Sequence, residues 1–291
     1  MTEYGLLLKG VGSFYEVLTE SGETVTSKAR GAFRREGLTP TVGDRVVIER
    51  QAQGYAQLKE ILPRKNLLVR PAAANVDQLL IVISASVPAP DWMLVDRLII
   101  AAKRLGVEPI PVLNKIDTAS DAVRTQFLNE YAAFTTLLLS AETHEGLEQL
   151  RALVKGKVTC LAGQSAVGKS SLLNALIPEL HLQTGTLSEK TERGRHTTRH
   201  AELWPYRGGA VLDTPGFSLF ETDCLEQDAL DACYPEFANA SPCRFPGCMH
   251  ITEPDCGVKP LLDTGELTEG RYERYTEIAK DYQQRRKHRY D

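Results

Sequence analysis

The stretch from Gly163 to Ser170 reads Gly-Gln-Ser-Ala-Val-Gly-Lys-Ser, a glycine-rich pattern suited to binding phosphate groups. We expect it between a buried strand over residues 158–161 and a helix over 171–177, the context that such a loop requires. Backbone N–H groups can converge on the phosphates, Lys169 adds positive charge at the β and γ phosphates, and the Ser170 hydroxyl can bind Mg²⁺. The expected nucleotide contacts here are Gly163, Gln164, Ser165, Ala166, Val167, Gly168, Lys169, Ser170 and Ser171.

A second motif, Asn114-Lys115-Ile116-Asp117, follows an apolar strand expected over residues 110–113. The Asp117 carboxylate can accept hydrogen bonds from guanine N1–H and the 2-amino group, and adenine offers neither donor in that arrangement. We expect a buried carboxylate here, and ATP is then disfavoured because an unpaired buried carboxylate costs on the order of a few kcal/mol. The Lys115 stem can pack over the base. Ser140-Ala141 ends the next strand, where a backbone N–H can reach guanine O6.

Magnesium ligands are expected in two further segments. Asp213-Thr214-Pro215-Gly216 ends an apolar strand over residues 210–212, so that Asp213 can hold Mg²⁺ through water and the Gly216 N–H can meet the γ-phosphate. Upstream, Gly194-Arg195-His196-Thr197-Thr198 supplies a threonine that can bind Mg²⁺ and sense the γ-phosphate. Thr198 is taken as the Mg²⁺ ligand beside Ser170 and Asp213, although the sequence does not choose between it and Thr197.

The catalytic candidate is His196. Many GTPases place a water-orienting glutamine directly after the Asp-x-x-Gly motif, but this chain has Phe217 there, and phenylalanine cannot orient water. The imidazole of His196 can hydrogen-bond a nucleophilic water, which makes it the best candidate for that role. The alternative is a solvated histidine in a mobile loop.

The order of these motifs is inverted. In ordinary GTPases the phosphate loop comes first and the base-reading motif last, whereas Asn114–Asp117 here precedes Gly163–Ser170. The sequence therefore predicts a GTPase-type domain whose chain is circularly permuted.

A cysteine and histidine cluster lies further along the chain, with the spacing Cys243-x4-Cys248-x-His250-x5-Cys256. Three thiolates and one imidazole form a tetrahedral set suited to one structural Zn²⁺. A closed set leaves no position for water, so we expect no catalysis there. Cys160 precedes the phosphate loop on an expected strand and is assigned to the core.

The N-terminal segment has short strands at roughly ten-residue spacing, over residues 14–18, 45–49 and 56–62, which favours a small OB-type β-barrel. Its basic stretch, expected to be a loop, contains Lys28, Arg30, Arg34 and Arg35. Such a barrel would present this loop to RNA, and the alternative is a charged surface loop of a barrel with another role. Residues 67–74 are expected to be a linker.

Beyond the linker, apolar strands alternate with amphipathic helices, which favours a mostly parallel sheet with helices on both faces. The expected strands cover 78–83, 110–113, 136–139, 158–161 and 210–212, and the helices cover 91–106, 120–131, 147–154 and 171–177. We thus expect a multidomain α/β protein. Its parts are an OB-fold RNA-binding domain over residues 1–70, a circularly permuted GTPase domain over 71–222, and a mainly helical zinc-binding domain over 223–291.

The formal net charge is 34 − 38 = −4, so the chain is no general polyanion binder, and contact with nucleic acid must use local patches. One candidate patch contains Arg285, Arg286, Lys287, His288 and Arg289, and the alternative is a solvated helix end. No apolar run approaches the ~18 residues of a membrane span, and no signal peptide is recognised. We expect a cytoplasmic protein without membrane contact.

Together, the Asn-Lys-Ile-Asp, phosphate-loop, Gly-Arg-His-Thr-Thr, Asp-Thr-Pro-Gly and Cys/Cys/His/Cys motifs closely resemble the ribosome small subunit-dependent GTPase A family (RsgA, also called YjeQ or YloQ). The resemblance covers essentially the whole chain. Its most specific parts are the permuted order combined with His196-Thr197-Thr198 and the cysteine spacing.

The resemblance implies a GTPase that binds the small (30S) ribosomal subunit and its rRNA during late maturation, with hydrolysis of GTP to GDP stimulated by the subunit. It implies phosphate and Mg²⁺ binding by Lys169 and Ser170, guanine binding by Asp117 and hydrolysis by His196. It also implies zinc binding by Cys243, Cys248, His250 and Cys256. We expect GTP or GDP and the small subunit as partners, and a monomeric chain.

Two other functions are considered. One is a nucleotide-gated RNA-binding module in which hydrolysis is incidental, and the nearly complete set of GTPase motifs favours the enzyme instead. The other is a metal-dependent nuclease, which the closed four-ligand set argues against because catalytic zinc needs an open position.

The first prediction concerns His196. His196→Ala should lower GTP hydrolysis by about 100-fold, the scale of lost general acid–base assistance, while GTP affinity stays near that of the unaltered protein. Single-turnover hydrolysis and nucleotide titration measure the two quantities. Unchanged subunit-stimulated turnover in this variant would remove the catalytic role.

Overall fold

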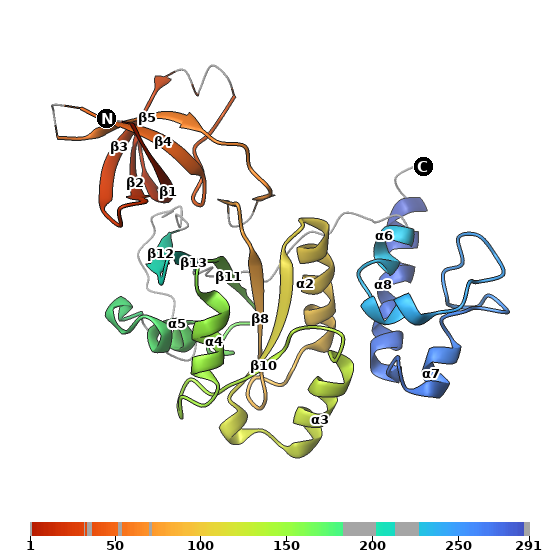
Figure 1. Ribbon diagram of the computed structural model, residues 1–291. Helices are drawn as coiled ribbons and strands as arrows, with labels where there is room; N and C mark the ends of the chain where they lie inside the picture. The colour runs from red at the N-terminus through yellow and green to blue at the C-terminus, as the bar shows by residue number, and fades with distance from the viewer. Residues whose placement is uncertain are drawn as a thin grey trace, which may run out of the picture.

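The computed structural model describes residues 2–31, 33, 37–51, 54–69, 72–182, 202–212 and 227–287. It has three parts, a β-barrel, a central sheet flanked by helices, and a C-terminal module (Figure 1). The barrel lies beside edge strand β12 of the central sheet, and the C-terminal module lies beside helix α2 (Figure 1). The multidomain α/β prediction is confirmed.

The N-terminal part is a closed barrel with the strand order β1-β2-β3-β5-β4. Its strands are β1 (Thr2–Val11), β2 (Phe14–Thr19), β3 (Thr24–Ala29), β4 (Arg45–Arg50) and β5 (Ala56–Ile61). Alternate side chains such as Val46 and Ile48 fill the interior. The sequence predicted β2, β4 and β5, but its alternation did not single out β1 or β3.

The prediction of a basic loop is wrong for Lys28, which lies in β3. Its backbone sits opposite Phe14 of β2 and Gln57 of β5, so the strand is paired on both sides. Arg34 and Arg35 lie outside the described residues.

Within residues 67–69 and 72–74, the segment predicted as a linker is packed against the fold. Strands β6 (Leu67–Leu68) and β7 (Ala73–Ala74) pair antiparallel, and both alanines and Leu68 are buried. The absence of a side chain at Gly43 allows this close approach, since a Cβ there would lie 2.1 Å from the Ala74 carbonyl oxygen. This connection therefore joins the barrel to the sheet through fixed contacts.

The central sheet has the order β10-β9-β8-β11-β13-β12. Its strands are β8 (Gln78–Ser84), β9 (Glu108–Asn114), β10 (Leu137–Leu138), β11 (Val158–Ala162), β12 (Leu203–Tyr206) and β13 (Gly209–Leu212). All pairs are parallel except β12 with β13, so the mostly parallel prediction is confirmed. Strands β8 and β11 are neighbours in the sheet. The two halves of the chain that carry the motifs therefore meet at the carboxyl ends of these strands.

Alternate side chains of the strands point to opposite faces of the sheet, and both faces are covered by helices. Leu79 and Ile81 pack with α2 (Trp92–Arg104) and α3 (Asp121–Glu130), whereas Leu80 and Val82 pack with α4 (Leu147–Val154) and α5 (Lys169–Leu176). Figure 1 shows the two helix pairs on opposite sides of the sheet. Short 3-10 turns cover Ile116–Thr118 and Pro178–Leu180.

The C-terminal module is mainly helical. It contains α6 (Gln227–Asp231), a 3-10 turn over Pro235–Asn239, α7 (Pro260–Thr264) and the long α8 (Glu269–Lys287). One of its two apolar clusters includes Ile100 of α2 together with Tyr275 of α8. The module is thus packed directly on the central domain.

None of the helices in the described ranges has both the length and the hydropathy needed to cross a membrane.

Candidate functional site

The buried side chain of Asn114 joins three of the predicted segments. Its Nδ2 donates to the Val167 carbonyl oxygen in the phosphate loop at 2.8 Å. Its Oδ1 accepts from the Ala141 backbone N–H at 3.3 Å. One amide therefore ties the ends of β9 and β10 to the loop after β11, and Ser140 is fully buried beside it. The structure confirms that these segments meet.

Lys115 reaches across to two loops. It has a positive φ of 63°, and its Nζ donates to the Ala166 carbonyl oxygen at 2.8 Å and to the Val87 carbonyl oxygen at 2.5 Å. The second contact involves the loop before α2, which the sequence did not implicate. Packing of the Lys115 stem on a base stays a prediction.

The carboxylate of Asp117 is exposed in the turn Ile116–Thr118, so the expectation of a buried side chain is wrong for the protein alone. The turn follows β9 in the chain. Within the part of the chain that the structure describes, this carboxylate is open to a ligand.

The phosphate loop closes around the ammonium group of Lys169. Lys169 Nζ donates to the carbonyl oxygens of Gly163 at 2.8 Å and Gln164 at 2.6 Å. Helix α5 begins at Lys169, two residues before the predicted start, so Ser170 and Ser171 lie in its first turn. Backbone N–H groups at such a helix start favour anions. The exposed loop residues Ser165 and Ala166 leave this side open to a ligand.

Several predicted site residues, His196, Thr197, Thr198, Asp213 and Gly216, lie outside the described residues. The described part of the chain places the strand before Asp213: β13 ends at Leu212 and pairs in parallel with β11, which leads into the phosphate loop.

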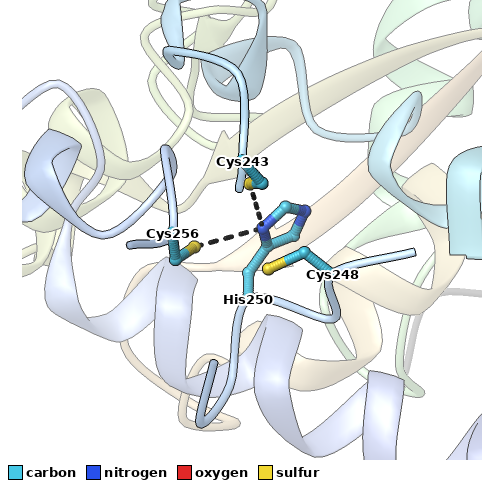
Figure 2. A group of neighbouring side chains, drawn as sticks. All are labelled: Cys243, Cys248, His250 and Cys256. Carbon is cyan, nitrogen blue, oxygen red and sulfur yellow. Dashed lines mark hydrogen bonds between the residues drawn. The ribbon is translucent and has the colours of Figure 1, made fainter. Parts of the chain in front are cut away.

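The predicted metal ligands Cys243, Cys248, His250 and Cys256 come together, with donor atoms within 4.8 Å of one another. Figure 2 shows the imidazole among the three cysteine side chains. His250 Nδ1 lies 3.5 Å from Cys243 Sγ and 3.3 Å from Cys256 Sγ. Tetrahedral bonds of 2.0–2.3 Å to a metal would put the donors about 3.5 Å apart. The set therefore fits a metal ion.

Asp231 holds the other side of the imidazole. His250 Nε2 lies 3.1 Å from Asp231 Oδ2, and the Tyr275 hydroxyl donates to Asp231 Oδ1 at 2.7 Å. A carboxylate in this place fixes the tautomer in which Nδ1 is free to bind a metal. The sequence gave no signal for Asp231, which lies far upstream in α6 and outside the cysteine spacing.

Two of the four donor groups have a raised pKa. Burial lowers the pKa of His250, but the hydrogen bonds to Asp231 and Cys256 outweigh burial and raise that pKa to about 9. Burial raises the pKa of the Cys248 thiol to about 12, close to the other two cysteines. A bound metal ion would supply the positive charge that lets all three sulfurs act as thiolates.

A parallel sheet carrying a phosphate loop downstream of an Asn-Lys-x-Asp segment defines a circularly permuted P-loop GTPase domain, here with a barrel and a Cys₃His module attached. A family model described as RsgA GTPase matches residues 61–223, and one described as RsgA N-terminal domain matches residues 4–57. The chain belongs to the RsgA GTPase family of GTP-hydrolysing enzymes.

The matched relatives and solved structures align with this chain over nearly its full length. The small ribosomal subunit biogenesis GTPase RsgA of Ruminiclostridium cellulolyticum is 42% identical, covering 96% of this chain and 93% of that protein. The protein of the same name from Geobacillus thermodenitrificans is 40% identical, with 97% and 98% covered.

Among solved structures, YjeQ from Thermotoga maritima has a TM-score of 0.84 and 34% identity, with 97% of this chain and 99% of that chain covered. YloQ, described as a circularly permuted GTPase, has a TM-score of 0.83 and 34% identity, with 98% and 96% covered.

The second prediction concerns Gly168, which has a φ of +99° and whose added Cβ would lie 2.3 Å from Asn114 Nδ2. Gly168→Ala should displace the Asn114 amide and weaken GTP binding by about tenfold or more, about 1.4 kcal/mol. The control is Gly156→Ala, which also has a positive φ of +70° but no neighbour within 4 Å. Both changes strain the backbone, so equal nucleotide affinity in the two variants would contradict the role of the Asn114 contact.

The third prediction concerns the Cys₃His set. Cys256→Ser should lower the bound metal from about one ion per chain to near zero and destabilise the loops of the C-terminal module, because metal binding contributes to folding. Elemental analysis and thermal unfolding measure the two effects. Cys233→Ala, a buried cysteine of the same module outside the set, should keep the metal. Equal metal content in both variants would refute the ligand assignment.

Proposed function

We propose that this chain is a GTPase of small ribosomal subunit biogenesis, which binds the small subunit during late maturation and hydrolyses GTP with stimulation by that subunit. The names of the relatives support the partner. The observation that carries the nucleotide assignment is the Asn114 amide, which joins the Asn-Lys-x-Asp segment to the phosphate loop.

The proposed nucleotide site follows the strand ends. Asp117 would read guanine, with Asn114, Lys115, Ser140 and Ala141 shaping the base pocket. Its exposed carboxylate is free of cover by the described residues and would accept two hydrogen bonds from an incoming base. The phosphates would lie over the loop and first turn comprising Gly163, Gln164, Ser165, Ala166, Val167, Gly168, Lys169, Ser170 and Ser171.

In the proposed reaction, water attacks the γ-phosphate in line with the leaving group. Lys169 and backbone N–H groups would stabilise the developing charge, since both are positioned before the reaction begins. His196 would orient the water. Ser170, Asp213 and Thr198 would hold Mg²⁺, Thr197 remains the alternative ligand, and the Gly216 N–H would contact the γ-phosphate.

For the metal of the C-terminal module we propose structural Zn²⁺. Three thiolates and one imidazole suit this ion better than the oxygen-preferring Mg²⁺ or Ca²⁺. The residues Cys243, Cys248, His250 and Cys256 would hold it, with Asp231 behind the imidazole.

We also propose the division into an RNA-binding barrel (1–70), a GTPase domain (71–222) and a zinc-binding domain (223–291), in a monomeric cytoplasmic protein. Support for RNA contact comes from the barrel surface. Phe14 is 47% exposed, Tyr55 packs edge-on at 6.5 Å, and Lys28 Nζ lies 5.7 Å from the Phe14 ring centroid. An exposed ring beside a cation suits stacking with unpaired bases.

The fourth prediction tests this function by GTP turnover with and without purified small ribosomal subunits. Small subunits should raise turnover about tenfold or more, about 1.4 kcal/mol of the barrier, and large subunits should not. Equal turnover under all three conditions would refute the ribosomal partner.

The same assay includes Asp117→Asn, which should turn preference from GTP to xanthosine triphosphate because the new amide donates where the carboxylate accepted. Asp121→Asn, an exposed residue of α3, is the matched control. Retained GTP preference in the Asp117 variant would remove the guanine assignment.

A further inference from the structure

Helix α2 carries acidic side chains that face two different parts of the molecule. Asp91 precedes its first turn and faces the phosphate loop, and Asp96 faces α8 of the C-terminal module. The two residues are about 7.5 Å apart along the axis and about 140° apart around it. In Figure 1, α2 lies between the central sheet and α8.

The Asp96 end is buried and fully paired. Asp96 Oδ1 accepts from Arg271 at 2.6 Å and from the Tyr131 hydroxyl at 2.9 Å, and its Oδ2 accepts from Arg274 at 2.6 Å. Arg274 also donates to Glu130 of α3 at 2.6 Å. These short charge-assisted bonds depend on direction, so α2 and α8 cannot slide past each other without breaking them.

Arg271 is held on all sides. It is 1% exposed, donates to Glu236 at 3.0 Å, and its guanidinium lies 4.5 Å from the Tyr234 ring centroid. A planar guanidinium stacked on a ring and paired with carboxylates has one favourable orientation. The contact between the module and α2 is therefore rigid at this point.

The Asp91 end holds the phosphate loop. Asp91 Oδ1 accepts from the Leu94 N–H at 2.9 Å and caps the helix, while Oδ2 accepts from Gln164 Nε2 at 3.3 Å. The carbonyl oxygen of the same Gln164 accepts from Lys169 Nζ at 2.6 Å. A displacement of α2 would thus reach the ammonium group at the proposed phosphate site through Gln164.

We propose that α2 is a positioning helix, through which Arg271 and Arg274 of the C-terminal module hold Asp91 against the phosphate loop and so set the affinity for guanine nucleotide. This inference rests on the proposed GTP site. It makes these arginines positioning residues that act at a distance from the nucleotide. The C-terminal module then influences the site through the helix, in addition to any influence through the chain between β13 and α6.

The experiment measures GDP and GTP-analogue affinity by titration, and GTP hydrolysis under single-turnover conditions, for Arg274→Gln in the full-length, metal-loaded protein. This variant keeps Arg271 and Tyr131 on Asp96 and should weaken nucleotide affinity by about 2- to 30-fold. The control Arg244→Gln removes an exposed arginine of the same module, which pairs with Asp255 at 2.8 Å, and should bind nucleotide like the unaltered protein.

A second variant tests the other end of the helix. Asp91→Ser keeps a good helix cap but its shorter side chain cannot also reach Gln164. It should weaken nucleotide binding. The double variant with Arg274→Gln should have the same nucleotide affinity as the single variant with the lower affinity, because both changes break the same series of contacts from α8 through α2 to Gln164. Additive losses, or Arg274→Gln with unaltered affinity, would overturn the proposal.

Folding is checked by metal content and thermal unfolding. A merely destabilised protein would lose active fraction, seen as fewer nucleotide-binding sites per chain in the titration, at unchanged affinity, and that result also counts against the proposal. If Arg274→Gln fails to fold, Arg274→Lys retains the charge but loses the two-branched contact with Asp96 and Glu130, and should show the same loss of affinity. Absence of GTP binding in the unaltered protein would instead refute the proposed function.

Discussion

The parallel pairing of β8 with β11 is the interaction on which the site depends. Gln78 to Ile81 lie opposite Thr159 to Ala162, and Gln78 Nε2 donates to Thr159 Oγ1 at 2.9 Å inside the sheet. This pairing joins the half of the chain that ends in Asp117 to the half that begins with the phosphate loop. Parallel strands present their carboxyl ends at one edge, so both motifs meet there whatever their order in the chain.

The permuted order has a consequence for how the other domains are attached. The barrel enters through the packed connection β6–β7 directly into β8, and the strand β13 leads toward the C-terminal module. Lys9 of the barrel also pairs with Glu202 beside β12 at 2.9 Å. The barrel therefore contacts the central sheet at its edge strand β12, whereas the C-terminal module contacts the central domain at α2.

The interface of α2 with α8 combines apolar packing with buried charge. Ile100 and Tyr275 bury apolar surface at this interface. Asp96 forms ion pairs with Arg271 and Arg274, whose geometry depends on the relative orientation of the two helices. Buried ion pairs add little net stability compared with apolar side chains of similar size, but removal of one partner is costly because a charge remains unpaired. Such an interface fixes one orientation of the module, which apolar contacts alone specify less strictly.

Much of the local structure was predictable because its signals are local. The helices predicted over 91–106 and 120–131 are present, with Asp91 and Ser120 as their N-caps. Helix α4 has the predicted bounds, and Cys160 is buried as expected. Strands β1 and β3 were not identified, because their pairing partners along the barrel, and not their own alternation, make them strands.

The sequence by itself determined which residues are proposed to carry the chemistry, because the phosphate-loop, Asn-Lys-x-Asp and Cys₃His patterns are defined by residue type and spacing. Only the tertiary structure decided what supports them. Asp231 behind His250, Val87 beside Lys115 and Asp91 against Gln164 are contacts between segments distant in the chain. The exposure of Asp117 belongs to the same class, because burial depends on what the rest of the fold places over a side chain. The spacing of residues in the sequence does not predict these contacts, because the partners come together only through the topology of the folded chain.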